Sequence, residues 1–235
     1  MINTEKNNTL TLFILEGAEA YHRWIFEKIS PYLGVNILEV GCGIGNLTGL
    51  LLRQGRVVVA DLNQDYLQKV QDQFRGDSNL KGGFLWDIRQ DPPKNLKTSI
   101  DTIVCSNVLE HIENDHDALR KFYELLPVGG KLIILVPALK FLYNVLDKGL
   151  GHFRRYNRDE LIQKITGNGF KVCTLRYFNL FGIVGWFING TLLRRRLLPS
   201  GQISVFNKMV PLFMRIEKVI PTWIGQSLIA VGKKI

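Results

Sequence analysis

Three glycines spaced two residues apart follow an apolar run, and a carboxylate stands just ahead of them. They are Gly41, Gly43 and Gly45, preceded by Glu39. Because glycine has no Cβ, such a loop can turn sharply and its backbone can approach a ligand closely. A dinucleotide-binding loop needs its third glycine three residues after the second, and that position is Asn46. The spacing therefore argues against a bound dinucleotide.

Two further carboxylates come after the next two apolar runs. Asp61 lies 22 residues after Glu39, and Asp87 follows Trp86. A carboxylate at the end of a strand can accept two hydrogen bonds from a ribose diol. Asp87 could likewise accept from an adenine amino group while Ile88 packs on the ring. Each acid alone is common in turns and helix caps, but their order behind a glycine loop predicts a nucleoside site.

Two other segments carry groups that could act on an acceptor molecule. His111 and His152 are candidate catalytic bases, because the imidazole pKa is close to neutral. The residues after His152 could bind a carboxylate, a phosphate or a planar ring, and they are Arg154, Arg155 and Tyr156. The alternatives are a His111 that orders its own loop and a solvated basic loop with Tyr156 packed inside. The cysteines are single, so we predict no metal site and no disulfide framework.

The elements that must position these groups alternate along the chain. Apolar strands with little alternation indicate burial on both faces, as in a parallel sheet covered by helices. We therefore predict an α/β, Rossmann-like and mostly parallel sheet with helices on both faces. Ligands bind beyond the carboxyl ends of such strands, where Asp61, Asp87 and Asn107 fall. Strands are expected at 35–40, 56–60, 83–86, 101–105, 131–136, 170–176 and 227–231, and helices at 16–33, 46–53, 64–74, 115–126 and 158–166.

The net charge of +9 is concentrated in the C-terminal part of the chain. Residues 171–235 hold ten Lys or Arg and one acid, which favours an anionic partner. An apolar run at 177–193 is followed by Arg194, Arg195 and Arg196, and an amphipathic helix is expected at 206–220. The run is short for a bilayer span and contains three glycines. We expect one domain over 1–235, with 177–225 as a helical cap or insertion before the last strand. The sequence leaves three roles open for this segment: capping the site, forming a dimer, or contacting the membrane peripherally.

These motifs resemble those of class I S-adenosylmethionine (SAM)-dependent methyltransferases, in the small-molecule branch. The resemblance rests on residues 39–45, Asp61, Asp87, residues 101–111 and the turn at 126–132, and the segment 107–111 is similar to the L-E-H stretch of ubiquinone-type O-methyltransferases. It implies a seven-stranded sheet with an antiparallel last strand, SAM as cofactor and S-adenosylhomocysteine as product. It also implies cofactor contacts from Glu39, Gly41, Gly43, Gly45, Asp61, Leu62, Asp87, Ile88 and Asn107.

The function expected from this resemblance is methyl transfer to a small-molecule or lipid-like acceptor, anionic or carrier-linked, with oxygen as the accepting atom. A nicotinamide-dependent reductase is disfavoured by Asn46 and by the lack of a Tyr-x-x-x-Lys pair. An RNA methyltransferase would use the basic tail for phosphates, but its cations are scattered, so a nucleic-acid partner is not expected. A non-catalytic SAM-binding scaffold stays an alternative, and a homodimer is one option for assembly. The polar N-terminus favours a cytoplasmic protein, at the inner membrane face if 177–225 touches lipid.

Overall fold

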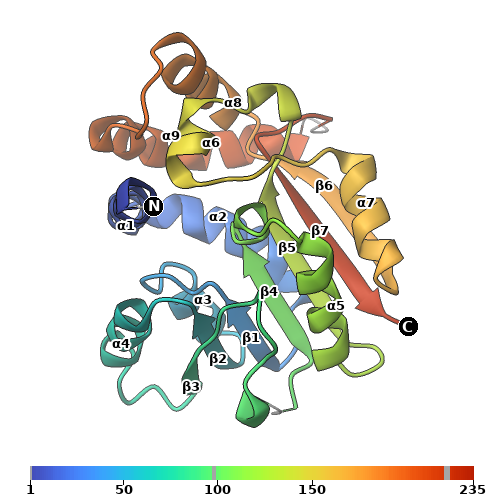
Figure 1. The fold of residues 1–235 in the computed structure, drawn as a ribbon. Coiled ribbons are helices and arrows are strands. Elements are labelled where there is room, and N and C mark those ends of the chain that lie inside the picture. The colour runs from blue at the N-terminus through green and yellow to red at the C-terminus, as the bar shows by residue number, and fades with distance from the viewer. Residues whose placement is uncertain (1, 97–98, 220–222) are drawn as a thin grey trace.

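A computed structural model of the chain describes residues 2–96, 99–219 and 223–235. Seven strands form one sheet in the order β3-β2-β1-β4-β5-β7-β6, and β7 runs antiparallel to both of its neighbours. The predicted mostly parallel, seven-stranded sheet with an antiparallel last strand is thus confirmed (Figure 1). The strands are β1 Asn36–Val40, β2 Arg56–Asp61, β3 Leu80–Leu85, β4 Thr102–Ser106, β5 Lys131–Pro137, β6 Phe170–Phe178 and β7 Ser227–Lys234.

Helices cover both faces of the sheet. Buried side chains of α5 and α7 pack on one face, and those of α2, α3, α4 and α9 pack on the other. The central strands are therefore buried on both sides, which explains why they read as continuous apolar runs. The helices are α1 Ile2–Glu16, α2 Glu19–Ile29, α3 Thr48–Leu52, α4 Gln64–Gln73, α5 Asp115–Leu125, α6 Val145–Leu150, α7 Arg158–Gly167, α8 Gly182–Trp186 and α9 Ser200–Val219, with shorter turns η1 Ser30–Tyr32, η2 Lys94–Leu96, η3 Leu109–His111, η4 Lys140–Leu142 and η5 Phe187–Leu192.

Two helices were not expected from the sequence. The polar N-terminus forms α1, although Met1 lies outside the described residues, and the helix expected at 16–33 begins only at Glu19. The second is α6, which starts with a capping box in which Asn144 and Asp147 bond each other's backbone N–H groups. Both helices sit beyond the carboxyl ends of the strands, so the site has more cover than the sequence indicated (Figure 1).

The insertion before the last strand is shorter than predicted. Tyr177 and Phe178 belong to β6, and the helical part consists of α8, the π-helical η5 and α9. The end of the predicted helix 206–220 falls at Ile220, outside the described residues. Figure 1 shows α8 and α9 near α6, above the upper end of β4 and β5. Among the described residues, no helix has the length and apolar character needed to cross a membrane.

Candidate functional site

The glycine loop after β1 is held tightly against the neighbouring strands. The backbone N–H groups of Gly41 and Cys42 both donate to the Ala60 carbonyl, at 2.7 and 3.2 Å. Gly41 has a φ of +73°, and a Cβ there would meet the Val108 side chain at 2.2 Å. This position therefore requires glycine for its conformation and for its space. Backbone hydrogen bonds to β2 therefore hold the start of the loop in place.

Asp61 sits at the end of β2, directly under the glycine loop. Its carboxylate accepts from the Gly43 N–H at 2.8 Å and from the Asn63 N–H at 3.0 Å. Burial raises the pKa of Asp61, and these backbone hydrogen bonds oppose the shift. A carboxylate has about four acceptor sites, so two bonds leave room for a ribose diol. The next residue, Leu62, is 67% exposed.

Glu39 turns inward from β1 rather than toward the loop. Its carboxylate accepts a hydrogen bond from the Thr48 hydroxyl of α3 at 2.6 Å, and the residue is buried. Burial raises the pKa of Glu39 to about 8, although the Thr48 hydrogen bond acts in the opposite direction. The described contact ties the end of β1 to the helix that follows the loop. Contact with a bound amino group stays a prediction.

The third acid of the cofactor motif is paired with a neighbour. Asp87 holds the Arg89 side chain in an ion pair at 2.6 Å, and Arg89 lowers the pKa of Asp87. Ile88 is buried beside it. Asp101 lies at the opposite end of the strands from the glycine loop, because it precedes β4. There its carboxylate accepts from the N–H of Asn36 at 2.9 Å, so Asp101 is a structural residue.

At the carboxyl end of β4, a short turn carries polar groups. This is the same end of the strands as the glycine loop after β1. Asn107 is exposed with a φ of +53°, and its N–H donates to the Leu135 carbonyl at 2.8 Å. Glu110 follows in η3 and is 1% exposed. Neither of its carboxylate oxygens has a hydrogen-bond partner among the described residues. Burial raises the pKa of Glu110 to about 7, while the nearby His152 and Arg155 act to lower it.

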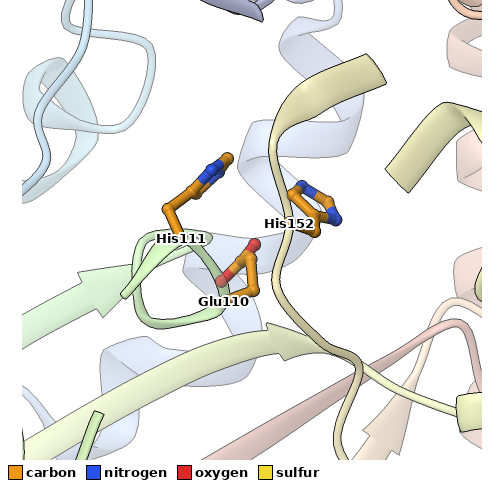
Figure 2. A group of neighbouring side chains, drawn as sticks. All are labelled: Glu110, His111 and His152. Carbon is orange, nitrogen blue, oxygen red and sulfur yellow. The ribbon is translucent and has the colours of Figure 1, made fainter. Parts of the chain in front are cut away.

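The two predicted catalytic histidines come together beside Glu110, although they are 41 residues apart in the chain. Their rings lie 4.8 Å apart, centroid to centroid, in an edge-to-face arrangement. Figure 2 shows Glu110 and His111 on one turn and His152 on the loop that crosses it. Burial, with a smaller effect of His152, lowers the pKa of His111 to about 3. His111 is therefore neutral at physiological pH and a weak proton acceptor.

His152 is oriented by Asp147, a residue that belongs to none of the motifs in the sequence. The Asp147 carboxylate lies 3.0 Å from His152 Nδ1 and accepts from Arg155 Nε at 2.8 Å and from Trp186 Nε1 at 3.1 Å. Asp147 is fully buried, which would raise its pKa, but hydrogen bonding to His152 and the charge of Arg155 hold that pKa below its usual value. The signal that could have revealed it is the Asn-x-x-Asp pattern of a capping box at 144–147.

Two predicted substrate-binding residues are in the core and not at the surface. Arg155 and Tyr156 are 1% and 0% exposed, so neither side chain is placed to contact an acceptor. Arg155 bonds Asp147 and the Ala138 carbonyl, while the Tyr156 hydroxyl donates to Asp115 at 2.8 Å. The cost of burying these two polar side chains is offset because each has an acidic partner from another segment. Arg154 is partly exposed and donates to the Glu113 carbonyl at 2.7 Å.

Residues 38–132 match the family model described as a methyltransferase domain. An uncharacterized methyltransferase of Bacillus cereus is 32% identical over 121 residues, covering 48% of this chain and 52% of the relative. A ubiquinone biosynthesis O-methyltransferase of Pseudomonas savastanoi is 24% identical over 152 residues, covering 57% and 63%. The chain thus spans less than two thirds of the length of either relative.

Solved structures share the fold over most of the chain. The N-methyltransferase NodS of Bradyrhizobium japonicum, in complex with S-adenosyl-L-homocysteine, superposes with a TM-score of 0.57 at 16% sequence identity. The match covers 91% of this chain and 85% of the other. At this identity the likeness describes the fold alone.

Proposed function

We propose that the chain is a class I SAM-dependent methyltransferase that transfers a methyl group from SAM to an oxygen of a small-molecule or lipid-like acceptor. The match of residues 38–132 to a methyltransferase domain supports the reaction class. The glycine loop, the acids that follow it and the seven-stranded sheet support this proposal. The similarity to a ubiquinone biosynthesis O-methyltransferase supports oxygen as the accepting atom.

We assign the cofactor to the edge formed by β1, β2 and β3. The site fits a nucleoside because Asp61 retains acceptor capacity and Leu62 is exposed next to it. In this proposal Asp61 holds the ribose and Asp87 the adenine, after exchanging its bond to Arg89. SAM supplies the activated methyl group when it is bound. The protein then contributes mainly the position of the acceptor and the exclusion of water.

The observation that carries the oxygen assignment is the pair of Asp147 and His152, whose atoms lie 3.0 Å apart. A hydroxyl acceptor must lose its proton during methyl transfer, and a buried carboxylate that binds Nδ1 orients Nε2 of an imidazole for this task. We therefore assign the base to His152. We assign His111, whose pKa is lowered to about 3, to packing against His152 and the acceptor.

The test measures binding and turnover separately. Calorimetry with SAM should give binding to the wild type and at least a tenfold loss in Asp61→Ala, whereas His152→Gln should bind SAM normally. With hydroxyl acceptors such as catechols and phenols, His152→Gln should turn over about 10²–10⁴ times more slowly than the wild type. His116→Ala, which removes an exposed histidine, is the matched control. Absence of SAM binding would overturn the proposal, and turnover of amines alone would overturn the oxygen assignment.

We further propose that the segment 177–225 brings the protein to an anionic membrane surface that holds a lipid-like acceptor. Of the described residues, more than half of the large apolar side chains that are exposed lie between 184 and 224. Arg194, Arg195 and Arg196 sit within that segment, next to Leu192 and Leu193, which are 64% and 52% exposed. Apolar groups flanked by cations suit an interfacial element.

Co-sedimentation with vesicles tests this contact. Vesicles of mixed phosphatidylcholine and phosphatidylglycerol should bind the wild type and release it as salt is raised. Neutralising all three arginines to Gln should weaken binding by about 1 kcal/mol per charge, or roughly 10²-fold in total. Lys81→Gln, on the far side of the sheet, serves as the charge control. Binding that ignores both salt and the three substitutions would refute the proposed contact.

A further inference from the structure

Three side chains at the acceptor end of the sheet form a group that can hold a metal ion. Glu110, His111 and His152 each offer one ligand atom, and these atoms lie within 4.8 Å of one another. Figure 2 shows them on two facing segments, the turn 109–111 and the loop at 151–156. Around a tetrahedral ion, neighbouring ligand atoms are about 3.4 Å apart. Small rotations of the side chains would therefore bring all three into contact with one ion.

Glu110 gives an independent reason to expect a cation here. It is 1% exposed, and neither carboxylate oxygen has a hydrogen-bond partner in the described parts of the chain. Buried carboxylates without a partner are rare, because burial removes their hydration without replacing it. Arg155 bonds Asp147 and the Ala138 carbonyl, and its charge lowers the pKa of Glu110, but it donates no hydrogen bond to that carboxylate. Glu110 is thus a buried acceptor directed toward two imidazoles.

The support behind His152 is of the kind that metal sites use. Its Nδ1 lies 3.0 Å from the Asp147 carboxylate, which leaves Nε2 as the nitrogen available to a ligand. Histidines that bind metals almost always give their other ring nitrogen to a carboxylate or carbonyl, which fixes the ring and strengthens the ligand. The His152 carbonyl also accepts a hydrogen bond from the Tyr143 hydroxyl at 2.7 Å. Both the ring and the backbone carbonyl of His152 are therefore held by hydrogen bonds.

From this geometry we propose that Glu110, His111 and His152 bind a divalent transition-metal ion, with Zn²⁺ as the species that best matches two imidazoles and one carboxylate. Such a donor set is selective against Mg²⁺ and Ca²⁺, which take oxygen ligands. Three protein ligands leave a fourth position open, as in catalytic zinc sites. A bound ion occupies the lone pair of His152 Nε2. His152 therefore cannot act as a base while the ion is bound. Ion binding is independent of the proposed methyl transfer, because it requires neither SAM nor an acceptor.

The experiment uses the full chain without a polyhistidine tag, stripped of metal by a chelator and then titrated with Zn²⁺ in a calorimeter. We expect one equivalent per chain, and Co²⁺ should give the visible absorption of a nitrogen- and oxygen-coordinated ion. Glu110→Gln and His152→Gln should each lower the Zn²⁺ affinity at least tenfold. Glu110→Gln preserves the side-chain volume, and circular dichroism verifies that both variants are folded.

Two control variants separate this site from other metal donors. His116→Ala removes an exposed histidine nearby, and Cys173→Ser removes an exposed thiol, so both should keep the wild-type Zn²⁺ affinity. The proposal is overturned if the stripped wild type takes up no Zn²⁺ at micromolar concentrations. It is also overturned if folded Glu110→Gln and His152→Gln both bind Zn²⁺ as tightly as the wild type. Normal SAM binding in the same samples would keep either result distinct from failure of the proposed methyl transfer.

Discussion

Both halves of the sheet bury acidic side chains, and they differ at Glu110. In the cofactor half, which comprises β1 to β3 and the loops after them, Asp61 and Glu39 have partners close in sequence, such as Gly43 and Thr48. In the acceptor half, which comprises β4, β5 and the segment 107–156, Glu110 has no described hydrogen-bond partner and its neighbours come from a distant loop. In the first half, a backbone N–H and a side-chain hydroxyl satisfy the two buried acids. The other retains a buried charge that a ligand or a proton must satisfy.

The largest expected effect comes from removing the carboxylate that organises the acceptor half. Asp147→Asn leaves the Arg155 guanidinium buried without its anionic partner, and His152 without its orienting group. Breaking a buried ion pair in this way costs about 3–5 kcal/mol of unfolding free energy. Urea unfolding measures the loss. The exposed Asp159→Asn should change stability by less than about 0.5 kcal/mol, and equal effects would mean that Asp147 does not organise this half.

The next effect depends on pH and concerns Glu110. Burial raises its pKa from 4.5 to about 7, so the folded protein keeps a proton that the unfolded chain releases. The stability from this protonation is complete below pH 4.5 and is lost as the pH rises through about 7. Glu110→Gln should therefore be more stable than the wild type by about 2–3 kcal/mol at pH 8 and equal to it at pH 4.

This measurement is made in chelator, so that no ion satisfies the carboxylate. Thermal unfolding at several pH values between 4 and 8 gives the two curves, and the exposed Glu113→Gln should run parallel to the wild type. A Glu110→Gln variant that is destabilised at every pH would show that the carboxylate has a favourable partner, and the contrast between the halves would disappear.

In the cofactor half, a smaller cost follows from filling the space at Gly41. A Cβ in Gly41→Ala would meet Val108 at 2.2 Å, and the φ of +73° is unfavourable for alanine. Overpacking of this kind costs roughly 1–3 kcal/mol, and SAM affinity should fall at least tenfold because the loop shifts. Gly185→Ala has open space around its Cβ and should leave SAM affinity unchanged. Tight SAM binding by Gly41→Ala would argue that the loop adapts rather than being fixed beforehand.

The smallest effect is expected at the exposed pair of Arg89 and Asp87. The Arg89 side chain is 67% exposed, so Arg89→Gln should change the unfolding free energy by less than about 1 kcal/mol. If Asp87 exchanges this partner for adenine, then Arg89→Gln should bind SAM as tightly as the wild type or more tightly, whereas Asp87→Asn should bind it more weakly. Calorimetry with SAM compares the two, and a loss of affinity in Arg89→Gln alone would reverse the assignment.

The comparison also explains how much of the site was accessible from the sequence. The contacts of the glycine loop with Asp61 join residues 18 apart, within one strand-helix-strand unit. The order of motifs along the chain predicts contacts within such a unit, and the apolar runs predict the strands of the sheet. Asp101 stands at the start of the strand expected over 101–105, and its carboxylate accepts from the Asn36 N–H at that end of the sheet.

The acceptor half could not be assembled from the sequence in the same way. The helix α6 is six residues long, too short for periodicity to detect, yet it carries Asp147. The burial of Arg155 and Tyr156 depends on Asp147 and on Asp115, the latter 41 residues from Tyr156. The sequence pattern alone favours a solvated basic loop for such residues. Their acidic partners come from other segments of the chain, and the sequence does not show that folding brings them together.

The position of β7 has a consequence for the order in which the chain can fold. Residues 227–234 lie between β5 and β6 and supply hydrogen bonds to both, so these two strands are joined in the sheet only through β7. Lys234 also donates to the carbonyls of Tyr123 and Leu126, behind α5. On a ribosome, the cofactor half can therefore form while synthesis continues. The acceptor half must wait with an open sheet edge, at which time it is most exposed to misfolding.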